Sequence, residues 1–234
     1  MKNWILSIVL FFISVLSFSQ IDHSDWDMLL KKHVSKSGKV DYIGFRADKQ
    51  KLTEYLDLLS ANVPAEEASD NAKKAFWCNA YNAVTVKVVI DNYPIRSLND
   101  IKMEGASVAT SRFIQMGDEK ISFNDIENKQ LKAFNKDPRI HFVLNNASFS
   151  CPILLNKAFT EENMEEVLTE QTKSFINDDA KNLVSKKSVT ISSIFEWYRI
   201  DFGDVRSFYN QYAKSIIPSG AKIGYLPYSW ELNE

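Results

Sequence analysis

The stretch "NAKKAFWCNAYNAVTVKVVIDNYP", residues 71–94, decides the fold of this chain. It predicts one long helix that stops near Pro94, because proline disfavours a helical conformation in the residue before it. The apolar side chains of this helix are not confined to one stripe: they are Phe76, Trp77, Tyr81, Val84, Val88 and Ile90. A helix that is apolar nearly all round is typical of a buried position. We therefore expect this helix to lie at the centre of the molecule.

Two asparagines in this helix, Asn79 and Asn82, are three residues apart and so share one face. Buried amides need hydrogen-bond partners. We expect the pair to clamp the backbone of a neighbouring segment. Cys78 lies between Trp77 and Asn79, where burial would make its thiol inert.

The segments around this helix are mostly helical in pattern. Residues 25–34, 49–60, 194–200 and 205–213 read as helices, as do segments that begin near Asn124 and Thr160. The stretch "RFIQMGDEKISF", residues 112–123, reads as a hairpin, and residues 38–45 as a short strand or extended turn. Helices outnumber strands and do not alternate with them. This predicts an α+β fold: a helix-rich single domain with a small, mostly antiparallel sheet and a buried central helix.

The N-terminus has the pattern of a secretory signal peptide. Lys2 precedes an apolar run from Trp4 to Leu16, and small residues Ser17 and Ser19 follow. This predicts removal of residues 1–19 by cleavage before Gln20. The alternative is an uncleaved anchor, although the run is short for a membrane span. We expect a secreted protein, periplasmic or extracellular, whose residues 20–234 form one globular domain with no membrane span after cleavage.

The composition argues against several classes of ligand. The formal net charge is −2, which gives no electrostatic reason to expect a nucleic-acid partner. The histidines and cysteines show no CxxC or HExxH spacing, and we find no glycine-rich phosphate loop. We expect no metal site and no cofactor, and a partner that is an unknown small molecule or peptide.

The stretch "RIHFVLNNASFSCPILL", residues 139–155, holds a possible catalytic pair. Residues 139–146 alternate like an interior strand that carries His141. Ser150 and Pro152 suggest that a helix starts at Cys151, which would favour its thiolate. His141 could then act as base, with Glu127 orienting its ring. The alternative is structural: Cys151 as a small buried hydrophobe, His141 in the core and Glu127 in solvent.

Several blocks in order resemble the domain-of-unknown-function family 547, an uncharacterised bacterial and plant family. The resemblance extends over about residues 72–233. The blocks are "FWCNAYNA" from Phe76, "YPIRSL" from Tyr93, "DIEN" from Asp125, "DPRIHFVLNNASFSCPIL" from Asp137, "SSIFEWYRIDF" from Ser192 and "YSWELN" from Tyr228.

The resemblance implies a shared fold and a shared cleft rather than a reaction. The matching positions are Asn79, Tyr81, Asn82, Glu127, His141, Cys151, Pro152, Trp197 and Trp230. Three positions depart from the family pattern: Asn128 stands where histidine is frequent, Asn146 where cysteine is frequent, and Ser229 where aspartate is frequent. A site that needed the first of these histidines would be incomplete in this chain.

Two functions remain open from the sequence. The first is a cysteine-dependent acyl-transfer enzyme, a hydrolase or transferase, with Cys151, His141 and Glu127 as catalytic residues. Backbone N–H groups near Cys151, or the Asn79 and Asn82 amides, could hold an oxyanion. The second is a non-catalytic envelope binding module or scaffold. Its aromatic cleft for a peptide, sugar or small ligand would be lined by Tyr81, Trp197, Tyr225, Tyr228 and Trp230.

Overall fold

The computed structural model describes residues 21–103, 105–131, 137–185 and 188–234. The predicted signal peptide, residues 1–19, lies outside these ranges. The α-helices of the described residues are α1 (Ser24–His33), α2 (Tyr42–Ala47), α3 (Lys49–Ala61), α4 (Asp70–Asn92), α5 (Phe123–Asp125), α6 (Met164–Ile176), α7 (Ile194–Trp197), α8 (Arg199–Phe202) and α9 (Val205–Tyr212). Shorter turns of 3₁₀ or π type are η1 (Leu98–Asp100), η2 (Ile126–Leu131) and η3 (Pro138–Phe142).

The strands are short and form separate small sheets. They are β1 (Lys102–Met103), β2 (Ala106–Ser107), β3 (Ile114–Met116), β4 (Glu119–Ile121), β5 (Leu183–Val184), β6 (Val189–Ile191) and β7 (Ile223–Tyr225). The pairs β1–β2, β3–β4 and β5–β6 are antiparallel, and β6–β7 is parallel. The predicted hairpin is β3–β4, which turns at Gly117 with a φ of 59°, a conformation that glycine adopts without strain. The predicted α+β class is confirmed.

Helix α4 is the buried central helix that the sequence predicts. Every residue from Lys74 to Val86 is buried. The Ser69 side chain caps its first turn by accepting a hydrogen bond from the Ala72 N–H at 3.1 Å. Helices α2, α3 and α6 pack against it. The apolar side chains that α4 carries on all of its faces therefore contact neighbouring helices rather than water.

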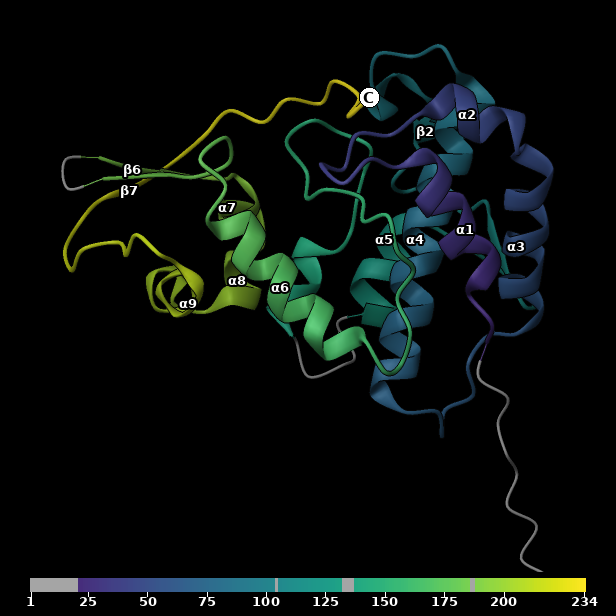
Figure 1. Ribbon diagram of the computed structural model, residues 1–234, viewed down its shortest axis with the longest axis horizontal. Coiled ribbons are helices and arrows are strands. Elements are labelled where there is room, and N and C mark those ends of the chain that lie inside the picture. The colour runs from purple at the N-terminus through teal and green to yellow at the C-terminus, as the bar shows by residue number, and fades with distance from the viewer. Residues whose placement is uncertain (1–20, 104, 132–136, 186–187) are drawn as a thin grey trace, which may run out of the picture.

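The core consists of two hydrophobic clusters. The N-terminal cluster gathers around α1 to α4 and includes Trp26, Phe45, Leu52, Tyr55 and Phe76. Half of the buried residues of the C-terminal cluster are aromatic: Phe142, Phe175, Phe195, Phe202, Phe208 and Tyr209. Helix α6 contributes to both, with Val167 and Leu168 in the first and Phe175 and Ile176 in the second. Figure 1 shows α6 between α1 and α3 at one end and α7, α8 and α9 at the other.

The interior strand predicted at residues 139–146 is wrong. Residues 138–142 form the 3₁₀ helix η3, and an irregular segment follows. The Asp137 side chain accepts a hydrogen bond from the Arg139 N–H, and Pro138 occupies the first helical position. Both features favour a helical start, in competition with the apolar alternation of the segment.

The helix predicted to start at Cys151 is also absent. Residues 151–163 contain no regular helix, and α6 begins only at Met164. Ser150 does not cap a helix here, because its N–H donates to the Ser229 carbonyl and its Oγ accepts from the Ser229 N–H. The prediction of a short strand or extended turn at residues 38–45 is wrong for the second half of this segment, because Asp41 caps α2 there.

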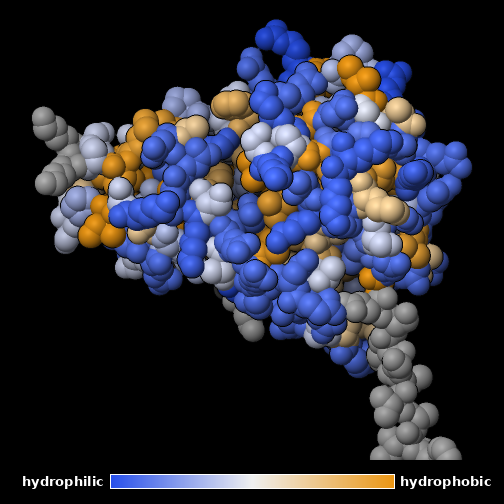
Figure 2. All heavy atoms as spheres, viewed as in Figure 1, coloured by the Kyte–Doolittle hydropathy of each residue, from blue (hydrophilic) through white to orange (hydrophobic). Residues whose placement is uncertain are grey.

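The C-terminal segment, residues 226–234, crosses the molecule from β7 to the neighbourhood of α2 (Figure 1). Backbone hydrogen bonds tie it to three separate regions: Val40 N–H to the Asn233 carbonyl, Leu232 N–H to Arg96, and Asn233 N–H to Ala147. The surface in the same view is largely hydrophilic with separate hydrophobic patches (Figure 2). Among the described residues, none of the helices combines the length and apolar character that a membrane crossing requires.

Candidate functional site

A small cavity between the two hydrophobic clusters contains the three residues predicted as catalytic. Its volume is about 40 Å³. The lining residues come from α4, η2, η3, the segment after η3, α7 and the C-terminal segment: Tyr81, Glu127, His141, Leu144, Asn146, Cys151, Pro152, Ile194, Trp197, Tyr198 and Tyr228. The fold thus brings together side chains that are far apart in the sequence.

His141 reaches the cavity because its neighbours in η3 are anchored on either side. Ile140 is buried in the N-terminal cluster and Phe142 in the C-terminal cluster. The His141 Nε2 atom lies 2.9 Å from the Asp201 Oδ2 atom, and the two side chains are only 9% and 10% exposed. The imidazole also stacks on the Tyr198 ring, with 3.8 Å between ring centroids. Asp201 therefore holds one nitrogen of His141, while Tyr198 fixes the plane of its ring.

Glu127, expected to orient His141, accepts a hydrogen bond from the Tyr198 hydroxyl at 2.9 Å. Burial, followed by the nearby Glu127 charge, raises the pKa of Tyr198 well above its ordinary value. Tyr198 is consequently a neutral phenol that donates to the carboxylate. The residues that the sequence argument missed here are Tyr198 and Asp201, although both lie in the quoted block "SSIFEWYRIDF".

Cys151 is held as a thiol. It is 3% exposed. Its Sγ donates to the Ser148 carbonyl at 2.9 Å and accepts from the Asn145 amide at 3.0 Å. Burial raises the pKa of the Cys151 thiol, which is opposite to the shift expected from a helix start. Among the described hydrogen bonds of Cys151, none goes to His141.

The other cysteine lies elsewhere in the fold. Cys78 is fully buried in α4, and burial raises the pKa of its thiol. Both cysteines are free, so no disulfide joins Cys78 to Cys151.

Three aromatic rings lie together beside this cavity: Trp197 and Tyr228 line it, and Trp230 contacts both of them. Trp197 and Trp230 are stacked, with 5.8 Å between centroids and 18° between planes, and Tyr228 contacts both. The two tryptophans are 48% and 39% exposed. The Tyr228 hydroxyl bonds to Ser148 Oγ at 2.7 Å and to the Asn146 amide at 3.1 Å. We call Trp197, Tyr228 and Trp230 the aromatic mouth. Its exposed surface is formed by the apolar rings of the two tryptophans, and its polar group is the Tyr228 hydroxyl.

Tyr225, which was also expected in an aromatic cleft, packs on the C-terminal cluster from β7. It does not line the cavity. Tyr81 does line it, and burial raises the pKa of its hydroxyl well above the ordinary value.

The Asn79 and Asn82 side chains bind backbone groups and do not line the cavity. Asn79 donates to the Phe159 carbonyl at 2.8 Å and accepts from the Phe159 N–H at 3.1 Å. Asn82 donates to the Val143 carbonyl at 3.0 Å and accepts from the Asn145 N–H at 2.8 Å. Since both amides are used in this way, they are not placed to hold an oxyanion.

The three departures from the family pattern have different surroundings. Asn128 is exposed and donates to the Asn124 carbonyl within its own helical segment. Asn146 lines the cavity and bonds to Ser148 and Tyr228. The Ser229 backbone pairs with Ser150. Only Asn146 of these three lines the cavity.

Residues 65–176 match the family model described as "Protein of unknown function, DUF547". The matched segment runs from the loop before α4 to the end of α6, so it includes Glu127, His141 and Cys151 but neither tryptophan of the aromatic mouth. Neither a curated protein nor a solved structure matches the chain. In the described part of the chain, no group of three or more His, Cys, Asp or Glu side chains is arranged to hold a metal ion.

Proposed function

The chain belongs to the DUF547 family of proteins of unknown function, and from that premise we propose that it is a binding module for a small ligand. The observation that carries this proposal is the aromatic mouth of Trp197, Tyr228 and Trp230 over a polar cavity. Exposed stacked indoles offer a flat apolar face, which binds rings and other flat apolar groups. The ligand that fits has such a face and a polar group that enters the cavity.

The cavity favours recognition over chemistry. Its thiol and phenol groups, those of Cys151, Tyr81, Tyr198 and Tyr228, have raised pKa values, so they are neutral hydrogen-bonding groups near neutral pH. The His141 ring is held by both Asp201 and Tyr198. Neutral groups in fixed positions orient a ligand without a reaction. The space of about 40 Å³ admits only a small polar group, while the bulk of a ligand would lie on the aromatic mouth.

A fluorescence titration tests the proposal. N,N′-diacetylchitobiose serves as the probe, because its sugar rings have apolar faces and its acetamide is a small polar group. We expect the bound probe to change tryptophan fluorescence, and Trp230→Ala to weaken binding by up to about tenfold, since an aromatic contact of this kind contributes roughly 0.5–1.5 kcal/mol. Ile200→Ala is the matched control, because Ile200 is 92% exposed and does not line the cavity. Binding that survives Trp230→Ala and Trp197→Ala would contradict the proposal.

The second candidate is a cysteine-dependent acyl-transfer enzyme. It is favoured by one observation, that Cys151, His141 and Glu127 line the same cavity. The test is alkylation by iodoacetamide near neutral pH, followed by digestion and mass measurement of each cysteine peptide. Cys78 serves as the internal buried control. Modification of Cys151 much faster than of Cys78 would favour the enzyme, and slow modification of both would favour the binding module.

The location of this module is proposed to be outside the cytoplasm, periplasmic or extracellular. The proposal rests on the signal-peptide pattern that ends at Ser19. N-terminal sequencing of protein from the envelope and medium fractions tests it. A chain that begins at Gln20 is expected, and a chain that retains residues 1–19 would indicate an anchored form.

A further inference from the structure

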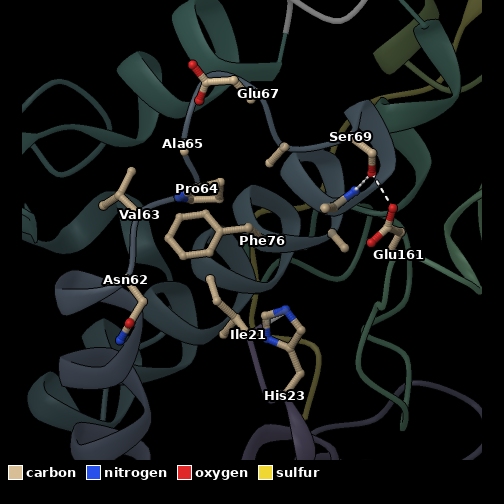
Figure 3. Close-up of a pocket in the computed structure, with 13 residues that line it drawn as sticks. Ile21, His23, Asn62, Val63, Pro64, Ala65, Glu67, Ser69, Phe76 and Glu161 are labelled. Carbon is tan, nitrogen blue, oxygen red and sulfur yellow. Dashed lines mark hydrogen bonds between the residues drawn. The ribbon is translucent and has the colours of Figure 1, made fainter. Parts of the chain in front are cut away.

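A second cavity shares none of its lining residues with the first. Its volume is about 520 Å³, within the range of small-molecule sites. Its walls are the segment before α1, the loop between α3 and α4, the first turns of α4 and Glu161 from the loop before α6. Figure 3 shows Phe76, Pro64 and Ile21 around the hollow, with His23 below and Glu161 at the side.

The floor of this cavity is apolar. Phe76, Pro64, Ile21, Ala72 and Ala75 line it. Phe76 and Ala75 are buried, so the accessible apolar surface comes from Pro64, Ile21 and Ala72. Such a floor gains free energy when an apolar side chain displaces water from it.

The imidazole of His23 supplies a hydrogen-bond donor at the base. His23 is 8% exposed, and its Nδ1 lies 2.7 Å from the Tyr55 hydroxyl. We assign the Tyr55 hydroxyl as the donor to Nδ1, because Tyr55 is buried and no other acceptor for it is present among the described residues. The proton of the neutral ring is then on Nε2, which has no partner among the described residues and points into the hollow (Figure 3). Burial lowers the pKa of His23 to about 4, so the ring is neutral near pH 7.

The rim is negative. Glu161 and Glu67 line the cavity, and its described lining contains no lysine or arginine. One carboxylate oxygen of Glu161 accepts from Ser69 Oγ at 2.5 Å, and the other is turned toward the hollow (Figure 3). This rim attracts a cation, while the base offers a donor to a carbonyl oxygen.

We propose that this second cavity binds the free amino end of an apolar peptide or amino-acid amide. The ammonium group lies against Glu161, the first carbonyl accepts from His23 Nε2, and the apolar side chain packs on Pro64, Ile21 and Ala72. This ligand satisfies the donor, the carboxylate and the apolar floor together. An acylated or anionic ligand leaves the carboxylate unpaired and is rejected.

The probes that test this are phenylalaninamide and N-acetylphenylalaninamide, which differ in the ammonium group. Binding is measured by NMR chemical-shift titration of the full chain at about pH 6.5, where the amine is protonated. We expect saturable shifts at Ala72 and Phe76 with phenylalaninamide, and no saturable shifts at these two residues with the acetylated probe. Equal saturable shifts at Ala72 and Phe76 with both probes, or none there with either probe, would overturn the proposal.

Variants of the lining residues test whether phenylalaninamide binds in this cavity. Glu161→Gln is expected to weaken phenylalaninamide binding about fivefold, the effect of a half-exposed ion pair. The matched control is Glu166→Gln, an exposed carboxylate on α6 that does not line the cavity. Ala72→Leu fills the hollow and abolishes binding, and the amide spectrum of each variant reports whether it is folded. Unchanged binding in both Glu161→Gln and Ala72→Leu contradicts the site.

The same titration separates this proposal from the binding-module proposal. Trp230→Ala changes the aromatic mouth only, so phenylalaninamide binding is expected to be unchanged. Loss of binding in Trp230→Ala, with no effect of Glu161→Gln, would place the probe at the aromatic mouth and overturn this second site.

Discussion

At the scale of single residues, Asn79 and Asn82 join α4 to two loops. Each amide uses both its oxygen and its nitrogen on backbone groups of one loop. Replacing either with alanine leaves a buried N–H and a buried carbonyl without a partner, which costs about 2–4 kcal/mol. We expect the free energy of unfolding, measured in urea, to fall by about this amount in Asn79→Ala and in Asn82→Ala.

The matched control for this prediction is in the same helix. Asn92 donates to the Val88 carbonyl from an exposed position at the end of α4. Asn92→Ala should cost less than about 1 kcal/mol, because water replaces the lost bond. Equal costs at Asn79, Asn82 and Asn92 would mean that burial of the amides is not the cause.

His23 gives the molecule a predictable response to acid. Burial lowers the pKa of folded His23 to about 4, from 6.5 for an ordinary histidine. Between these values the unfolded chain binds more protons than the folded chain, so stability is full above about pH 6.5 and falls as the pH drops toward 4. At about pH 4.5 the loss from this group is about 2 kcal/mol.

A comparison with His23→Gln isolates this effect, because the carboxylates titrate in both proteins. Urea unfolding near pH 7 and near pH 4.5 measures the change in free energy for each. The natural protein should lose about 2 kcal/mol more than the variant over this range. An identical loss in the two proteins would show that His23 is not neutral in the folded chain.

At the scale of elements, the packing of α4 determines which residues it accepts. Ala83 is fully buried in α4. Leucine has nearly the helix propensity of alanine, so an isolated helix would tolerate Ala83→Leu. In the packed core, the added volume should cost about 1–3 kcal/mol in the free energy of unfolding. Ala72→Leu is the control, since Ala72 borders the second cavity; a similar cost there would contradict packing as the cause.

The segment 137–146 shows how an element is decided by competing local signals. Alternating apolar residues indicate a strand, while Asp137 and Pro138 indicate a helical start. The arrangement of the two clusters resolves this competition, because Ile140 and Phe142 reach different clusters from a single 3₁₀ turn. Arg139 adds contacts with Asp137 and with Glu165 of α6, which hold the turn in place.

At the scale of the whole molecule, the C-terminal segment connects regions that are otherwise distant. It bonds to Val40, Arg96, Ala147 and Phe149 through the backbone. It also carries Tyr228 and Trp230 of the aromatic mouth. Removing residues 227–234 should lower the free energy of unfolding by about 3 kcal/mol, given a net contribution of about 0.5–1.5 kcal/mol for each hydrogen bond.

Circular dichroism during urea unfolding measures this loss, and deletion of Glu234 alone is the control. The Glu234 side chain accepts from the exposed Tyr93 hydroxyl, so its loss should change stability little. A truncated chain as stable as the full chain would show that the segment rests on the molecule without stabilising it.

The sequence by itself determined the features that depend on neighbours along the chain. The length and burial of α4 follow from its apolar pattern, the β3–β4 hairpin from alternation around Gly117, and the α+β class from the order of the elements. These signals are local, since each is read within a few turns or strands. The quoted blocks also contain Tyr198 and Asp201, yet nothing in their spacing reveals that they meet His141.

The tertiary structure alone decided which side chains meet and in which chemical state. Asp201 reaches His141 across 60 residues of sequence, and Tyr198 reaches Glu127 across 71. The segment around Cys151 is irregular because residues 229–231 bind its backbone, so the thiol lacks the helix dipole expected from its local sequence. Burial then raises its pKa. The physical reason is that desolvation and long-range pairing depend on the whole packed chain, whereas a sequence pattern reports only local preference.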